Sequence, residues 1–357
     1  MSPFGQAPGY GLITPPDQGW LQTALAEDII EPDLPIIDPH HHLWDNPRHR
    51  YLVPEFAADL ATGHRVLATV YMNCWIMYRS GGPAEMQPVG EVEFANGQAA
   101  MSASGQYGPT HIAAGIVGTC DANLGDRVEP VIATLIAAGN GRLRGVRVSG
   151  GWDEDRSISS PAQAPGLYDR ADVRAALRVV QRAGLSFDAL VFHPQLRDVV
   201  NLARALPDLK IVLNHMGQPL GFGRHSDRRA GFEIWRGLMR EVALCPNVTV
   251  KLGGILLRLA LPDHVARGAR PPTSEELAIL WRPWIETTIA AFGPDRCMFE
   301  SNFPVEKMGL GYAALWNAFK RMATDYSSAE KAALFSGTAA RVYRLQDVVA
   351  QAVERAA

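Results

Sequence analysis

The sequence predicts an α/β fold, a distorted (β/α)8 barrel of the TIM type, from three observations. Its 357 residues suit such a barrel with insertions. Hydrophobic residues make up 47% of the chain and charged residues 20%, which supplies a large core and excludes disordered and collagen-like chains. Short apolar, β-branched runs alternate with amphipathic stretches, as expected for parallel strands that are buried on both faces.

Eight apolar runs are expected to form the strands of the barrel, and a period of 3.6 residues predicts the helices. The strands are Pro35–His42, Val66–Asn73, Ile112–Thr119, Gly145–Ser149, Ser186–His193, Lys210–His215, Val248–Gly253 and Cys297–Asn302. The helices are Trp20–Glu27, Val89–Ala103, Arg127–Ala138, Ala171–Ala183, Leu196–Leu206, Phe232–Leu244, Glu275–Phe292 and Tyr312–Ala323.

Three segments are expected along the chain. Residues 1–34 contain Pro, Gly and acidic residues and form an N-terminal arm packed on the domain surface. Residues 35–345 form the barrel, and residues 346–357 form a C-terminal helical tail. A long excursion over residues 76–110, rich in Gly, Ser, Met and Pro, is expected to carry one helix and a loop that covers the barrel mouth.

Charge and cysteine content limit the partners and the compartment. A net charge of -3 argues against a nucleic-acid or anionic-membrane partner. No apolar run approaches the ~18 residues of a membrane span, and the N-terminus lacks the pattern of a signal peptide. The four cysteines have no CxxC spacing and favour a reducing compartment. We therefore expect a cytoplasmic protein with a small-molecule substrate, and the sequence leaves a homo-oligomer open.

Four histidines lie at the carboxyl ends of predicted strands, where an α/β barrel places its chemistry. His40 and His42 end the first strand and share its inward face, whereas His193 and His215 end the fifth and sixth strands. An inward HxH pair can hold a divalent metal or polarise a carbonyl group. Four histidines at one rim favour a functional site over four independent core residues.

The eighth strand carries Glu300 and Asn302 on one face. Glu300 could act as a general base at the mouth, or it could be a structural ion-pair partner of Arg147 or Lys251. Arg147 lies within an apolar run, where a guanidinium group is costly unless paired, so it either clamps a substrate carboxylate or forms a structural salt bridge. Lys251 has the same two interpretations.

Three further residues are candidates for substrate binding. Asn73 ends the second strand, and Trp44 and Trp75 lie just beyond strand ends. The two indole rings could wall an apolar or aromatic substrate, although each alone is more typical of core packing.

Six motifs in this order resemble the amidohydrolase superfamily, in the amidohydrolase-2 branch that includes 2-pyrone-4,6-dicarboxylate lactonase and sugar lactonases. The resemblance runs from about Pro35 to Leu345 and implies a barrel that most commonly hydrolyses a cyclic ester or amide. The motifs are DPHHHLWD (Asp38–Asp45), FHPQ (Phe192–Gln195), NHMGQP (Asn214–Pro219), VKLGG (Val250–Gly254), FESNFPVEK (Phe299–Lys307) and FSGTAARVYRL (Phe335–Leu345).

The resemblance implies that one divalent ion, zinc being the expected one, is held by His40, His42 and His193, if a metal is bound. His215 would then hydrogen-bond the attacking water or the carbonyl group. Asn302 departs from the branch, because it stands where an Asp is usual, so we expect weak or substoichiometric metal and slightly favour a metal-free site. No lysine precedes Lys210, which excludes the binuclear centre with a carboxylated lysine.

These observations predict a hydrolase that acts on a lactone or related cyclic ester or amide of a small carboxylated or aromatic substrate. His40, His42 and His215 would polarise the carbonyl group, and Arg147 would fix an anionic group. Either Glu300 or a water held by Asn302 would deliver the nucleophile. Two alternatives remain open at this point, a non-oxidative decarboxylase of the same superfamily and a barrel that binds a ligand without turnover.

Overall fold

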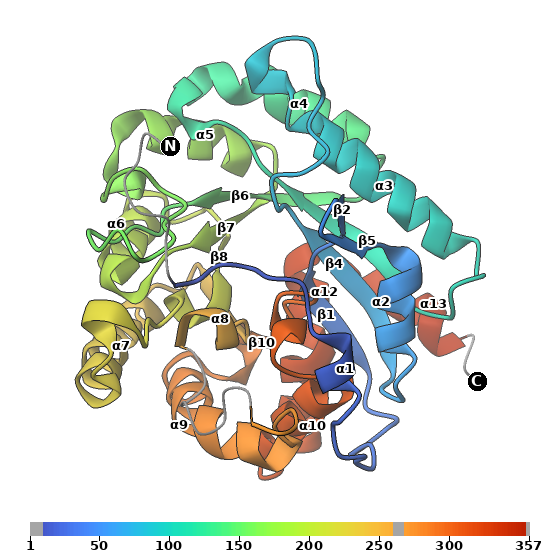
Figure 1. The fold of residues 1–357 in the computed structure, drawn as a ribbon. Coiled ribbons are helices and arrows are strands. Elements are labelled where there is room, and N and C mark those ends of the chain that lie inside the picture. Colours follow the sequence, from blue (N-terminus) through green and yellow to red (C-terminus); the bar gives the residue numbers. More distant parts are fainter. Residues whose placement is uncertain (1–9, 260–267, 355–357) are drawn as a thin grey trace.

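The computed structural model describes residues 10–259 and 268–354, and it confirms the predicted (β/α)8 barrel (Figure 1). Eight parallel strands form one sheet in chain order. The strands are β1 (Ile36–His41), β4 (Val66–Met72), β5 (His111–Gly118), β6 (Leu143–Ser149), β7 (Ser186–Leu190), β8 (Ile211–Leu213), β9 (Val248–Leu252) and β10 (Cys297–Phe299).

The chain that follows β10 closes the barrel against β1. The Asn302 backbone N–H donates to the His40 carbonyl oxygen at 2.8 Å, and the His42 N–H donates to the Phe303 carbonyl oxygen at 2.7 Å. A single β-bridge joins His41 and Phe303. The histidine motif after β1 is therefore held beside the segment after β10.

Helices cover the outside of the barrel, and their apolar faces pack on the strands to form the main core. Capping residues set several starts: the Asp227 carboxylate accepts from two N–H groups at the start of α7, and Thr273 with Glu276 forms a capping box on α9. The helices are α1 (Gln18–Leu21), α2 (Val53–Leu60), α3 (Val89–Ala103), α4 (Glu129–Ala138), α5 (Ala171–Arg182), α6 (Leu196–Ala205), α7 (Arg228–Ala243), α8 (Leu256–Leu259), α9 (Ser274–Phe292), α10 (Tyr312–Met322), α11 (Ser328–Ala332), α12 (Thr338–Tyr343) and α13 (Gln346–Glu354).

Three strands end two or more residues before the predicted position. β7 ends before His193, which starts a 3-10 turn, and β8 and β10 end before His215 and Asn302. His215 and Asn302 have φ values of 53° and 54°, in the left-handed region, which lies outside the extended geometry of a regular strand. These side chains are thus aimed by turns rather than by strand alternation.

Some elements were absent from the prediction. A short hairpin of β2 (Trp44–Asn46) and β3 (His49–Tyr51) follows β1, and α2 follows the hairpin. The helix expected over residues 20–27 is replaced by the single turn α1. In the part of the chain that the structure describes, no helix combines the length and the apolar character that crossing a membrane requires.

Candidate active site

A cavity of about 490 Å³ lies at the carboxyl ends of the barrel strands. Its size is typical of a site for a small molecule. Six residues that the sequence singles out line it: His42, Trp44, Trp75, Arg147, His215 and Asn302.

His40 and His42 point into the barrel, and their Nε2 atoms lie 3.3 Å apart. The His42 Nδ1 atom lies 2.9 Å from the Met72 carbonyl oxygen, so Nδ1 carries the proton and Nε2 carries the lone pair. Burial lowers the pKa of both imidazoles well below the usual value, and the Lys251 cation lowers that of His40 further. Both rings are therefore neutral.

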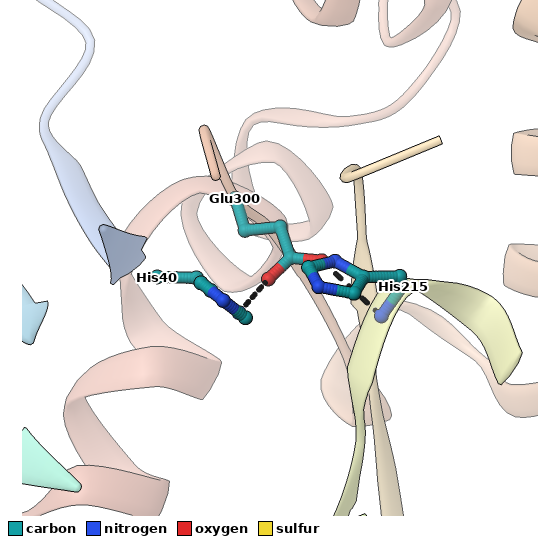
Figure 2. A group of neighbouring side chains, drawn as sticks. All are labelled: His40, His215 and Glu300. Atoms are coloured by element: carbon teal, nitrogen blue, oxygen red, sulfur yellow. Dashed lines mark hydrogen bonds and ion pairs between the residues drawn. The ribbon is translucent and has the colours of Figure 1, made fainter. Parts of the chain in front are cut away.

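Glu300 is completely buried between two histidines, as Figure 2 shows. Its Oε1 atom accepts a hydrogen bond from His215 Nδ1 at 2.7 Å, and the His215 backbone N–H donates to the same oxygen at 3.3 Å. Its Oε2 atom lies 2.7 Å from His40 Nδ1, without the alignment of a hydrogen bond. Glu300 thus fixes the tautomer and orientation of His215 and contacts His40.

Two glycines of the VKLGG motif make room for this pair. A Cβ atom on Gly254 would lie 1.8 Å from His215 Nδ1, and Gly254 has a φ of +62°. A Cβ atom on Gly253 would lie 2.3 Å from the Glu300 carbonyl oxygen. Both close approaches require the absence of a side chain. The glycines that end β9 therefore belong to the architecture of the site.

Lys251 pairs with Asp188 rather than with Glu300, since their Nζ and Oδ1 atoms lie 3.0 Å apart and both side chains are fully buried. The Lys251 Nζ atom also lies 3.4 Å from His40 Nδ1. Because Lys251 lies beneath the cavity and is absent from its lining, it supports His40 from below instead of contacting the cavity.

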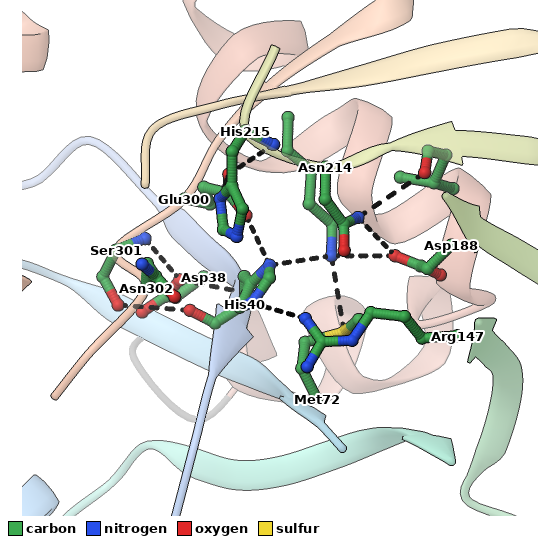
Figure 3. A network of polar contacts seen from close by, with 12 residues as sticks. Asp38, His40, Met72, Arg147, Asp188, Asn214, His215, Glu300, Ser301 and Asn302 are labelled. Carbon is green, nitrogen blue, oxygen red and sulfur yellow. Dashed lines mark hydrogen bonds and ion pairs between the residues drawn. The ribbon is translucent and has the colours of Figure 1, made fainter. Parts of the chain in front are cut away.

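Arg147 lies between Asn73 and His40, and Figure 3 shows its contact with His40. Its Nε atom donates to Asn73 Oδ1 at 2.8 Å, and one terminal nitrogen donates to the Asn73 carbonyl oxygen. Its other terminal nitrogen lies 3.4 Å from His40 Nε2, and the guanidinium carbon lies 5.6 Å from the centre of the Trp75 ring. Asn73 is thus a buried support, and Arg147 presents its cation to the cavity.

Asn302 links His42 to a carboxyl group that sequence reasoning missed. Its amide lies 3.3 Å from His42 Nε2 and 3.4 Å from Glu306 Oε1. Burial raises the pKa of Glu306 to about 8, so its carboxyl group carries a proton at neutral pH. The Asn302 Oδ1 atom faces His42 and its Nδ2 atom donates to Glu306 Oε1, so the amide bridges the two side chains.

His193 lies apart from this group. Its Nδ1 atom accepts from the Leu220 N–H at 3.2 Å, and its ring packs edge-on against His225 with centroids 5.1 Å apart. Burial and the His225 charge lower the pKa of His193 to about 4. The FHPQ motif alone gave no sign of this, because the chain leaves β7 three residues before His193.

Within the described residues, one group fits a divalent ion: His40, His215 and Glu300, whose ligand atoms lie within 4.8 Å of one another. Two imidazole nitrogens and a carboxylate oxygen are donors that zinc accepts. This donor set shares only His40 with the set that the resemblance implies, and it contains the carboxylate that a rim with Asn302 was expected to lack.

Comparison with known proteins adds three relatives. A protein-family model described as amidohydrolase matches residues 37–345. The uncharacterized protein y4mH of Sinorhizobium fredii is 32% identical over 88% of this chain and 99% of that protein. L-fucono-1,5-lactonase of Burkholderia multivorans is 28% identical over 87% of this chain and 96% of that protein. A crystal structure of a Burkholderia multivorans amidohydrolase with bound zinc has a TM-score of 0.66 and 26% identity, over 87% and 99% of the two chains.

Proposed function

The chain belongs to the amidohydrolase family and is a hydrolase, and from this premise we propose that it opens the ring of a lactone with water. One observation carries the proposal: His215 lines the cavity while its Nδ1 is fixed on the buried Glu300 carboxylate. The proton on Nδ1 leaves the lone pair on Nε2, which is the arrangement of an imidazole general base with an orienting carboxylate.

His215 would remove the proton from an attacking water molecule at Nε2. The water oxygen bonds to the lactone carbonyl carbon, and the carbonyl oxygen becomes an oxyanion. Glu300 stabilises the imidazolium that forms, because its carboxylate already accepts the Nδ1 proton. The ring C–O bond then breaks, and His215 returns its proton to the leaving alkoxide oxygen. The product is an open hydroxy acid.

Arg147 and the amide of Asn302 would stabilise the carbonyl oxygen. Both line the cavity, and both are almost completely buried, so their charge and dipole act in a medium of low polarity. The same guanidinium group suits the carboxylate of the product, or a carboxylate that the substrate already carries. Trp44 and Trp75 supply flat apolar walls beside it.

In place of the hydrogen bond between His215 and Glu300, these two residues and His40 would hold a divalent ion, and we propose zinc from the nature of the donors. Such an ion, when bound, polarises the carbonyl group and acidifies water. The orientation and the protonation state of His215 do not depend on this ion, because Glu300 sets both through its hydrogen bond to Nδ1.

A panel assay tests the proposed function. The purified protein is offered five- and six-membered lactones, linear esters and hydroxybenzoate carboxylates, each with and without a chelator, and product acid or carbon dioxide is measured. Release of acid from lactones is the expected result. Carbon dioxide release instead would favour a decarboxylase, and binding without either product would favour a non-catalytic barrel.

We also infer a cytoplasmic location, which all four free cysteines support. Cell fractionation with an antibody tests this inference, and recovery of the protein outside the cytoplasm would contradict it.

A further inference from the structure

We propose that residues Tyr10–Pro15, here termed the N-terminal strap, form the outer wall of the cavity and select lactones that carry an apolar substituent. The proposal rests on the proposed lactonase function and adds a substrate class to it. Residues 11–15 line the cavity, although they lie outside the segment 37–345 that matches the family. The strap therefore lies outside the part of the chain that the family model matches.

The strap is anchored at its first residue. The Tyr10 N–H donates to the Ser157 carbonyl oxygen at 2.8 Å, and the Ser159 N–H donates to the Tyr10 carbonyl oxygen at 3.0 Å. The Tyr10 ring stacks on Phe222 with centroids 4.7 Å apart and an interplanar angle of 9°. Two backbone hydrogen bonds and a stacked pair fix this end to the loops after β6 and β8.

The strap is also held near its other end. The N–H and hydroxyl groups of Thr14 lie 3.1 and 3.5 Å from the Met308 sulfur atom, in the segment after β10. In the strand order of the barrel, β6 and β10 are four positions apart among eight, so they lie on opposite sides of the mouth. The strap therefore spans the mouth, and Figure 1 shows this part of the chain crossing the barrel toward α1.

The loops that hold Tyr10 are tied to each other. The Asp153 carboxylate, in the loop after β6, lies 2.8 Å from His225 Nε2 and 3.0 Å from Arg224 Nε. Both partners follow Phe222 within three residues, and His193 packs on the His225 ring. This cluster, in which Asp153 and His193 are buried, ties together the two loops that support the strap, and a selective wall requires such support.

The cavity is polar at its base, and on the side of the strap its rim is aliphatic, whereas Asn46, Arg48 and His49 contribute polar side chains to the lining. The basal residues His42, Arg147 and His215 are at most 5% exposed. Leu12 and Ile13 in the strap line the same cavity and are 49% and 53% exposed.

Contact between half-exposed aliphatic side chains and an apolar group of a ligand removes apolar surface from water and makes the free energy of binding more favourable. Contact with a hydroxyl group of a ligand gives no such contribution. Trp75, across the cavity, is 53% exposed and extends the apolar rim. A substrate with its ring at the base and an alkyl or aryl group at the rim would cover all three. The rim therefore favours a substituted lactone over a polyhydroxylated one.

Two six-membered lactones test the proposal, δ-valerolactone without a substituent and δ-decalactone with a pentyl chain. In the wild type, kcat/KM should be higher for δ-decalactone. Leu12→Ser and Ile13→Ser should each lower that value about tenfold and should lower the value for δ-valerolactone far less. Leu25→Ser is the matched control, because Leu25 is 57% exposed on the same arm and lies outside the cavity lining. Equal losses on both lactones, or no loss on either, would overturn the proposal.

A binding measurement separates this proposal from the function on which it rests. Titration calorimetry gives the Kd of the ring-opened acids 5-hydroxydecanoate and 5-hydroxypentanoate. We expect about tenfold tighter binding of the longer acid by the wild type and loss of this preference in Ile13→Ser. If no lactone is hydrolysed, the proposed function fails, and the ratio of Kd values still decides on the strap. Equal Kd values in the wild type would overturn the strap proposal.

Discussion

His215 Nδ1 lies 2.7 Å from Glu300 Oε1, at the base of a cavity that His215 reaches and Glu300 does not. The short distance and the burial of Glu300 indicate different roles for the two residues. Glu300 cannot reach a substrate, so it acts through the imidazole that it orients. The expectation that Glu300 itself might take the proton from water is thereby replaced by the proposal that His215 takes it.

Glu300→Gln should lower kcat by ~10²-fold or more, because an amide keeps the shape and loses the charge that stabilises the imidazolium. Steady-state kinetics and the melting temperature, measured on the same variant, check this. A variant with full activity, a lower melting temperature and a free energy of unfolding reduced by about 3 kcal/mol would make Glu300 a purely structural residue.

Gly254→Ala should abolish most activity, because the new Cβ atom would collide with His215 Nδ1 and a φ of +62° strains any L-residue. A loss in kcat of about 10²-fold is expected, together with a lower melting temperature. Gly237→Ala, in α7, is the control, since nothing lies within 4 Å of its Cβ position. That control should keep its activity and gain up to about 1 kcal/mol of stability. Normal kinetics in Gly254→Ala would contradict the geometry.

The pKa of Glu306 predicts a pH-dependent stability. The unfolded chain releases this proton near pH 4.5 and the folded protein near pH 8, so the folded state binds more protons between these values. Stability contributed by this group is present below pH 4.5 and is lost as the pH rises through about 8. Glu306→Gln removes this loss. Its free energy of unfolding, relative to the wild type, should therefore increase by on the order of 3 kcal/mol from pH 5 to pH 8, and denaturant unfolding at each pH measures it. A pH-independent difference would contradict the assignment.

Arg147→Lys should lower kcat/KM by about 10²-fold while the fold persists, because an ammonium group cannot hold Asn73 and face the cavity at the same time. Arg142→Lys is a matched control at the opposite end of β6 and should behave as the wild type. Circular dichroism monitors folding in both. Unchanged kinetics in Arg147→Lys would remove Arg147 from substrate binding.

Metal removal is expected to leave catalysis largely intact. After dialysis against a chelator, activity on the best lactone should remain within about tenfold of its starting value, because Glu300 orients His215 without an ion. Asn302→Asp should increase zinc occupancy, measured by elemental analysis, since it adds an anionic oxygen beside His42. Complete loss of activity that only zinc restores would contradict a base formed by His215 and Glu300 alone.

The sequence was sufficient to predict the barrel and most of its mouth. Parallel strands end at one rim, so polar residues after apolar runs converge, as His40, His42, His215 and Asn302 do. The same argument does not extend to His193, because two irregular residues separate it from β7 and its ring packs against His225. Turn geometry depends on tertiary contacts that periodicity does not encode.

Roles were harder to predict than positions. The left-handed backbone of His215 and Asn302 is unusual for residues with side chains, and no propensity indicates it. Glu306 lies in the FESNFPVEK motif, but the motif indicates no role for it, since its contact with Asn302 needs the turn that follows β10. The sequence predicts that the strap belongs to an arm on the domain surface. Its contact with the cavity involves only residues 11–15, which are too few to show a periodic pattern.

A double-mutant cycle on kcat tests the central claim most directly, with His215→Asn, Glu300→Gln and the variant that combines both. If Glu300 acts only through His215, the double variant should be no slower than His215→Asn, within about a factor of three, because residues that act as one unit lose their effect together. Melting temperatures ensure that all three proteins are folded. A double variant slowed by the product of the two single losses would show that the residues act independently, and it would contradict the account.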